Sequence, residues 1–84
     1  MMATEKAISV QVGSFRNRIN AEKLARKLAS GGYESRVEMP VRQHDNMFRV
    51  KVGRLSSKGE AEALAAKLKA AGYNTKICDG EACE

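Results

Sequence analysis

The sequence is poor in the residues that most often carry catalysis, metal binding or membrane insertion. Its 84 residues include one histidine, one proline, two cysteines and no tryptophan. No apolar run approaches the roughly 18 residues that a membrane-spanning helix needs, and residues 1–6 lack the apolar stretch of a secretion signal. Apolar residues make up 43% and charged residues 30% of the chain, as in ordinary globular proteins. We therefore expect one soluble domain that is either cytoplasmic or excised from a longer protein.

The few candidate catalytic side chains form no constellation. His44 lies in the polar segment 40–46, and we expect it to be exposed or at the rim of a ligand site. Glu22 and Glu62 fall on predicted helix surfaces, where solvation or ion pairing explains them better than acid/base chemistry. Cys78 has no neighbouring base to activate it. The sequence predicts a protein that is not an enzyme and holds no metal or cofactor.

The two cysteines leave one question open. Cys78 and Cys83 are five residues apart, a spacing that fits no zinc site. A small disulfide loop and two free thiols both remain possible, since closing so short a loop stabilises little.

The formal net charge of +5 indicates an acidic partner. Nucleic acid, anionic lipid and acidic polysaccharide all satisfy that requirement. Charge alone does not choose among them.

The chain contains an internal repeat. Residues 8–39 align without a gap with residues 48–79, forty positions later. The identical pairs are Val10/Val50, Val12/Val52, Gly13/Gly53, Ala21/Ala61, Glu22/Glu62, Leu24/Leu64, Ala25/Ala65, Lys27/Lys67, Leu28/Leu68, Gly32/Gly72 and Tyr33/Tyr73. Repeat arrays need about three or more units to bury a continuous core, so two copies must close on each other.

Each half-repeat predicts a strand, a helix and a second strand. Residues 8–12 and 48–52 alternate apolar and polar side chains, as strands with one buried face do, and we expect Gly13 and Gly53 to end them. A helix follows each, with apolar residues at i, i+3, i+4 and i+7. These residues are Ala21, Leu24, Ala25 and Leu28 in the first helix and Ala61, Leu64, Ala65 and Leu68 in the second. The second strands are expected at 35–39 and 75–78.

The helix ends are predicted by their capping residues. Asn17 and Ser57 occupy N-cap positions, and Glu60 completes a capping box with Ser57. The helices should end at Gly32 and Gly72, which suit the left-handed position of a Schellman motif. The tyrosine after each glycine is then expected to pack on the last helical turn, Tyr33 on Leu28 and Tyr73 on Leu68.

These elements predict an α+β domain with the βαββαβ topology of RNP-like and ferredoxin-like folds. A four-stranded antiparallel sheet in the spatial order 75–78, 8–12, 48–52, 35–39 (order 4-1-3-2), with both helices on one face, buries every apolar stripe. The domain should span residues 7–79, with a disordered boundary at 1–6, a tail at 80–84 and a hairpin loop at 40–46.

The opposite face of that sheet is expected to be open, polar and mostly basic. By alternation it carries Ser9, Gln11, Arg36, Glu38, Arg49, Lys51, Lys76 and Cys78. RNA-recognition modules of this topology stack bases on aromatic residues of the two central strands. Those positions hold no aromatic residue here, so nucleic-acid binding would rest on phosphate contacts alone.

Two pairs of motifs connect the repeat to a family. The segment V-Q-V-G-S-F is followed by A-E-K-L-A-R-K-L-A-S-G-G-Y, and F-R-V-K-V-G-R-L is followed by E-A-E-A-L-A-A-K-L-K-A-A-G-Y. With the forty-residue spacing, these motifs resemble the SPOR (sporulation-related repeat) domain over about residues 7–78. The resemblance implies an RNP-like fold that binds bacterial cell-wall glycan strands stripped of their stem peptides and targets its host protein to the division septum.

The resemblance also implies where the ligand binds. Gln11 and Ser14 match the family's polar pair in and just after the first strand, and Arg49 and Lys51 lie where its third strand meets ligand. Met47 stands at or beside a site where some members place an aromatic residue. The candidate ligand-binding residues are Ser9, Gln11, Ser14, Arg36, Met47, Arg49 and Lys51.

The expected partner is thus peptidoglycan, with no nucleic acid and no membrane contact by this segment. The chain is expected to be monomeric and to work in the periplasm or cell envelope, at the septum, within a larger protein. A nucleic-acid binder on the same fold and a ferredoxin-like regulatory domain that dimerises or binds a small molecule are the alternatives.

Overall fold

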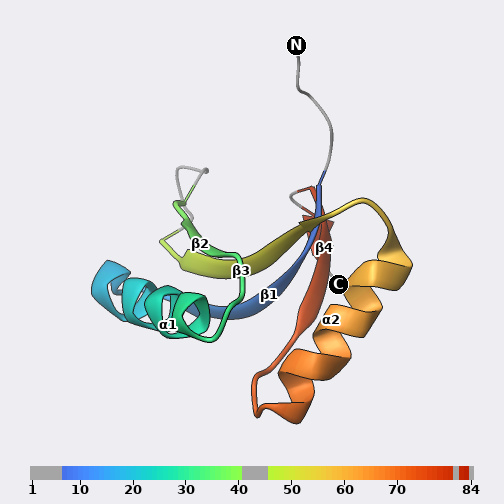
Figure 1. Cartoon of the computed structure of the whole chain (residues 1–84). Coiled ribbons are helices and arrows are strands. Elements are labelled where there is room, and N and C mark those ends of the chain that lie inside the picture. The colour runs from blue at the N-terminus through green and yellow to red at the C-terminus, as the bar shows by residue number, and fades with distance from the viewer. Residues whose placement is uncertain (1–6, 41–45, 81, 84) are drawn as a thin grey trace.

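The two half-repeats fold as equivalent strand–helix–strand units. The computed structural model describes residues 7–40, 46–80 and 82–83. The first unit consists of β1 (Ile8–Phe15), α1 (Arg18–Ser30) and β2 (Ser35–Glu38), and the second of β3 (Phe48–Leu55), α2 (Lys58–Ala70) and β4 (Lys76–Asp79). A short strand, β5 (Ala82–Cys83), follows (Figure 1). The expectations for residues 1–6 and for His44 lie outside the described residues.

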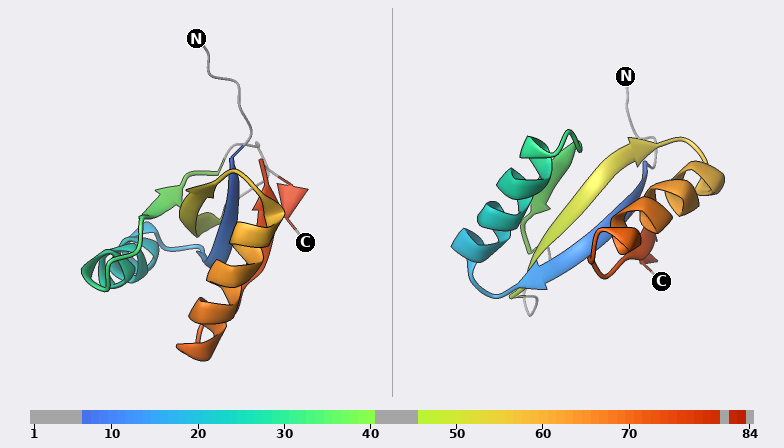
Figure 2. Two further views of the ribbon diagram at one scale, coloured as in Figure 1. Left: turned by 45° about the vertical axis from the view of Figure 1, so that its right-hand side comes forward. Right: turned by 60° about the horizontal axis from the view of Figure 1, so that its bottom comes forward.

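The strands form one antiparallel sheet in the order β2-β3-β1-β4-β5. The predicted α+β fold, with its order of four strands, is confirmed. Both helices lie on the same side of the curved sheet, α1 against β2 and β3 and α2 against β1 and β4 (Figures 1 and 2). The strand β5 was not predicted, and it adds an edge strand within the segment predicted to be a tail.

The expectation that Gly13 and Gly53 end the central strands is wrong. Both strands continue for two more residues. The register between β1 and β3 shifts at two places, between Ile8 and Val10 and between Gln11 and Gly13. A bulge inserts one residue and so reverses which face the later side chains occupy. Phe15 and Leu55 consequently pack against the core instead of facing outward.

The predicted inward residues form the core. Val10, Val50, Leu28 and Leu68 are each at most 2% exposed, and the other predicted inward residues of the helices, Ala21, Leu24, Ala25, Ala61, Leu64 and Ala65, are buried or pack against that cluster. Val10 pairs with Val52 across β1 and β3, which brings the two half-repeats together at the centre of the sheet. The two copies thus close on each other, because neither could bury its apolar stripe alone.

The helix ends match the predicted caps. The Asn17 side chain accepts a hydrogen bond from the amide of Ile19, and Ser57 accepts one from the amide of Glu60. The Glu60 carboxylate reaches back to the amide and hydroxyl of Ser56, each at 3.1 Å. The bonds accepted by Asn17 and Ser57 satisfy helix amides that have no partner within the helix.

Both helices end in the predicted Schellman motif. The amides of Tyr33 and Tyr73 bond to the carbonyls of Leu28 and Leu68, and Gly32 and Gly72 have φ of 92° and 101°. The tyrosine rings pack against the core.

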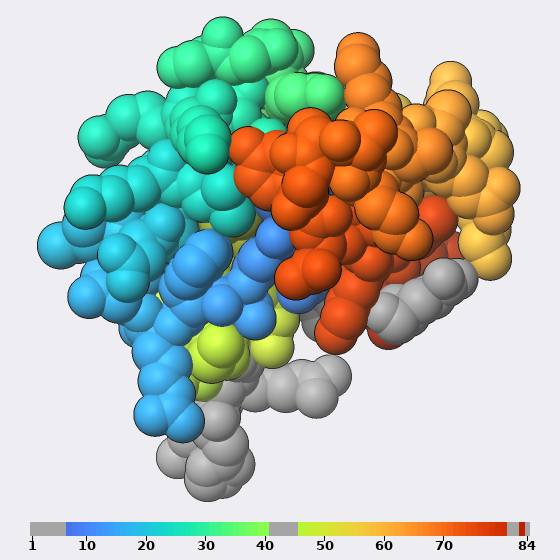
Figure 3. Space-filling view, turned by 90° about the horizontal axis from the view of Figure 1, so that it is seen from below, coloured from blue at the N-terminus to red at the C-terminus, as the bar shows by residue number. Residues whose placement is uncertain are grey.

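Each tyrosine also contacts a lysine on the helix of the other half-repeat. The Lys67 ammonium lies 5.5 Å from the Tyr33 ring centroid, and the Lys27 ammonium lies 6.0 Å from that of Tyr73. Figure 3 views this layer and shows the turn after α2 lying against α1.

Candidate functional site

Polar side chains cross the side of the sheet opposite the helices in transverse rows. The strand register places Arg36 beside Lys51, Lys51 beside Gln11, and Gln11 beside Lys76. A second row runs from Glu38 through Arg49 to Ser14. Simple alternation from Ser9 and Gln11 would point Ser14 toward the helices. The bulge in β1 adds one residue to the strand, so Ser14 lies on this side instead. We call this set, together with Ser9 and Cys78, the polar face.

Its centre is not the open surface that the sequence predicts. Ser9 is 1% exposed, Gln11 9%, Lys51 2% and Cys78 0%. Strand alternation identified their side of the sheet correctly, but alternation carries no information about what covers that side. The accessible members of the polar face lie around this buried centre.

Lys51 is covered by an ion pair. Its ammonium lies 2.8 Å from Glu38 Oε1, and its side chain is 3% exposed whereas that of Glu38 is 40% exposed. The second carboxylate oxygen of Glu38 lies 3.7 Å from Arg36 Nε. Arg36 also donates to the Gly53 carbonyl at 2.9 Å. One carboxylate therefore offsets two of the four cations on the face and fixes their positions.

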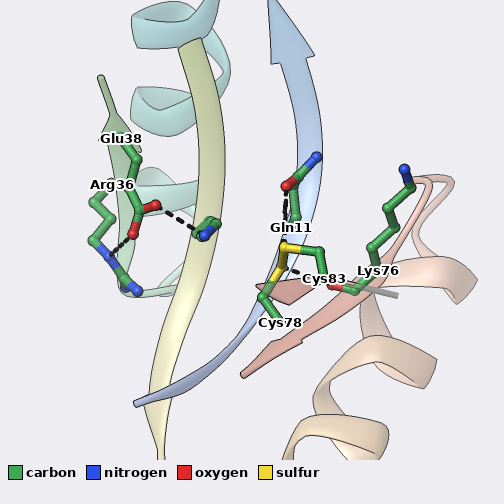
Figure 4. Close-up of a disulfide and its surroundings, with 7 residues drawn as sticks. Gln11, Arg36, Glu38, Lys76, Cys78 and Cys83 are labelled. Carbon is green, nitrogen blue, oxygen red and sulfur yellow. Dashed lines mark hydrogen bonds and ion pairs between the residues drawn. A yellow bond between two sulfur atoms is a disulfide. The ribbon is translucent and has the colours of Figure 1, made fainter. Parts of the chain in front are cut away.

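Gln11 is covered by a disulfide. Cys78 and Cys83 are bonded to each other, which decides between the two alternatives left by the sequence. Gln11 Oε1 lies 3.6 Å from Cys83 Sγ and 4.0 Å from Cys78 Sγ, while its amide nitrogen points away from the sulfurs (Figure 4). Disulfide sulfurs carry no hydrogen, so these are contacts without a donated proton.

Among the predicted ligand-binding residues, those that solvent reaches lie around the buried centre, and most of them lie toward the Ser14 end of the face. Ser14 is exposed and pairs across the strands with Arg49, which is half-buried. Arg36 and Met47 are also half-buried, and Lys76, an outward residue at the other end of its row, is exposed. Arginine can donate paired hydrogen bonds to a carboxylate, and a serine hydroxyl can both donate and accept. This end of the face is suited to a ligand with carboxylate and hydroxyl groups.

Two features of the site were not predicted from the sequence. The role of Glu38 was detectable in principle, since it is the only carboxylate among the outward residues and lies one strand from two cations. The contact of Cys83 with Gln11 was not, because nothing in the tail predicted a fifth strand. The described residues 7–40, 46–80 and 82–83 contain no group of three potential metal ligands and no helix long and apolar enough to cross a membrane.

Comparison with known proteins adds two findings. The family model described as the SPOR domain matches residues 4–77. The solution structure of the peptidoglycan-binding domain of the B. subtilis cell wall lytic enzyme CwlC is similar, with a TM-score of 0.73 and 29% sequence identity. The similarity covers 93% of this chain and 94% of that one. No curated protein matches the chain.

Proposed function

The chain belongs to the SPOR domain family, and we propose that it binds bacterial cell-wall peptidoglycan without catalysing a reaction. The observation that carries this proposal is the similarity, over nearly the full length of both chains, to a domain whose described role is peptidoglycan binding. Family membership over residues 4–77 supports the same role. A two-helix layer on one side of the sheet leaves the polar face as the surface for a polymer.

We propose further that the preferred ligand is a glycan strand stripped of its stem peptides. Such a strand alternates N-acetylglucosamine with N-acetylmuramic acid, whose lactyl group ends in a free carboxylate once the peptide is removed. Arg49 and Arg36 can donate charge-assisted hydrogen bonds to that carboxylate, and Ser14 can bond to hydroxyl or acetamido groups. A stem peptide would convert the carboxylate into an amide and remove the charge that the arginines recognise.

The accessible residues, Ser14, Arg36, Met47 and Arg49, are the first candidates for these contacts. Ser9, Gln11 and Lys51 remain proposed ligand residues, but their burial means that the disulfide or the ion pair above them must move before a sugar can reach them. This separates the predicted site into a part that is accessible and a part that is covered.

The family also supports a location for the protein. We propose that the domain works as a monomer in the periplasm or cell envelope and directs a larger host protein to the division septum. Microscopy of a fluorescent fusion in dividing cells tests this, with even distribution along the envelope as the contradicting result.

Cosedimentation with purified sacculi tests the ligand. We expect retention on sacculi treated with an amidase, which removes stem peptides, and little retention on untreated ones. Arg49→Ala should weaken retention by roughly tenfold, the effect of losing one charge-assisted contact. Arg26→Ala, which removes the same charge from the exposed surface of α1, is the matched control and should bind normally.

Two outcomes contradict the proposal. Equal retention on treated and untreated sacculi would remove the preference for stripped strands, leaving general cell-wall binding. Equal weakening by Arg49→Ala and Arg26→Ala would mean that net charge, and not the polar face, drives the binding.

A further inference from the structure

Two polar groups of buried residues next to the disulfide lack hydrogen-bond partners within the described part of the chain. The Ser9 hydroxyl oxygen is buried and has no such partner there, and its residue is only 1% exposed. Among the described residues, Gln11 Oε1 meets only the disulfide sulfurs, which cannot donate. Folded proteins rarely leave buried polar groups unpaired, because the lost bonds to water are not replaced. Two such groups side by side on a binding face require an explanation.

The disulfide forms part of their cover. Strand register aligns Ser9 with Cys78 on β4, and Cys78 with Cys83 on β5, so all three lie in one row across the sheet. Cys83 Sγ also makes the closer of the two sulfur contacts with Gln11. Figure 4 shows the disulfide beside the Gln11 carbonyl oxygen.

Among the described residues, few contacts besides the covalent bond hold β5 in place. The strand is two residues long and pairs with β4 at only two positions, Cys78 with Cys83 and Asp79 with Ala82. Pairings this short are not stable on their own in water. Breaking the disulfide should therefore release β5 while leaving the four-stranded core of the sheet intact.

We propose that β5, tied to β4 by the disulfide, is a redox-controlled lid over the β1 side of the polar face. When it is oxidised, a ligand reaches the Ser14 and Arg49 end of the face. When it is reduced, Gln11 and Ser9 are uncovered and their unpaired groups bond to sugar hydroxyl or acetamido groups. The lid thus determines how much of the face a glycan can occupy, and this inference rests on the proposed function.

The accessibility of the two sulfurs sets the order of the reduction. Cys83 is exposed whereas Cys78 is 0% exposed, so a thiolate of a dithiol reductant attacks Cys83 Sγ. The bond between the two protein sulfurs breaks, and Cys78 leaves with the electron pair and takes up a proton. The second thiol of the reductant then attacks the mixed disulfide, which frees Cys83 and converts the reductant into its own disulfide. Two electrons pass from the dithiol to the protein.

Binding to amidase-treated sacculi, measured with and without excess dithiothreitol, tests the lid. We expect reduction to tighten binding by about tenfold, the gain from pairing two neutral polar groups. Cys83→Ser should bind as tightly as the reduced protein and should no longer respond to dithiothreitol. Gln11→Ala should cut the gain on reduction to about threefold, since one of the two uncovered groups is lost.

The outcomes separate the lid from the proposed function. Equal or weaker binding after reduction overturns the lid but leaves the proposed function standing. Loss of cooperative unfolding in the reduced protein, followed by circular dichroism, also overturns it, because the disulfide would then hold the fold together. Absence of binding in both redox states contradicts the proposed function, and the lid with it.

Discussion

The ion pair between Lys51 and Glu38 supports a prediction about which side chains of the polar face are structural. The Lys51 side chain is 3% exposed and that of Glu38 is 40% exposed, with 2.8 Å between ammonium and carboxylate. Exposed ion pairs contribute about 0.2–1 kcal/mol, whereas removing one partner of a buried pair costs about 3–5 kcal/mol. Because one partner is buried and the other is half in water, we expect a coupling free energy between these two ranges, about 1.5–3 kcal/mol.

A double-mutant cycle measures this coupling. The variants are Lys51→Met, Glu38→Gln and the two combined, and urea denaturation gives the free energy of unfolding of each. We expect Glu38→Gln to be the more damaging single change, because it leaves a buried ammonium without its carboxylate. Lys51→Met should cost less, since a methionine fills the same space without a charge. The double variant should then be more stable than the sum of the single effects implies.

A small coupling would refute this reasoning. If the cycle gives less than about 0.5 kcal/mol, the Lys51 ammonium is hydrated and behaves like an ordinary surface charge. Binding to amidase-treated sacculi supplies an independent check on the same variants. Retention of binding by Lys51→Met would remove Lys51 from the predicted ligand residues and leave the recognition of charge to Arg49 and Arg36.

The other predictions concern the scaffold. Gly53→Ala should destabilise the domain by about 1–2 kcal/mol, measured by urea denaturation, since Gly53 has a φ of 86° that favours glycine and an added Cβ would lie 3.1 Å from Leu64. Gly59→Ala is the control, because its Cβ would meet only the Ser57 hydroxyl at 4.0 Å. It should be neutral or stabilise the domain by up to about 1 kcal/mol. Equal destabilisation by the two substitutions would show that the backbone conformation at the bulge is unimportant. The amide and hydroxyl of Ser56 hold the pKa of Glu60 below its ordinary value of 4.5, so the carboxylate stabilises the fold above that value and ceases to do so as pH falls through the lowered pKa. Glu60→Gln should accordingly melt at a lower temperature than the parent at neutral pH and at the same temperature in strong acid, and a melting difference independent of pH would contradict the assignment.

Most of the fold follows from the repeat and its periodicities. The identical pairs Val10 with Val50 and Leu28 with Leu68 are core residues in both halves, because burial constrains residue type at equivalent positions. The caps at Asn17 and Ser57 were predictable for a similar reason, since their side chains meet a local requirement of the backbone. Local rules of this kind need no knowledge of the rest of the chain.

The bulges were harder to predict. Gly13 and Gly53 follow an alternating strand, a pattern that equally suits a strand end and a continuing strand with an inserted residue. The apolar Phe15 and Leu55 two residues later were the available signal, since each becomes an inward residue only if the strand continues with one position added. Alternation of apolar and polar residues alone favours a strand that ends at the glycine.

Only the Glu38 half of the cover on the polar face was detectable from the sequence, although the symmetry of the fold relates it to the other half. In the repeat, Gln11 corresponds to Lys51 and Cys78 to Glu38. The structure reproduces the contact in both halves: Glu38 covers Lys51 from β2, and Cys78, bonded to Cys83, lies against Gln11 from β4. The geometry of the contact is therefore a property of the scaffold, and only its chemistry differs.

Because of that difference, salt and a reductant should affect the two halves of the face differently. The contact between Glu38 and Lys51 is electrostatic, so added salt weakens its half-exposed part. The contact at Gln11 is held by a covalent bond between sulfurs, so salt leaves it unchanged and a dithiol removes it. A repeat that keeps its core apolar while changing the outward residues of one contact can thus give one sheet two covers of different chemistry, each of which limits what a ligand can reach.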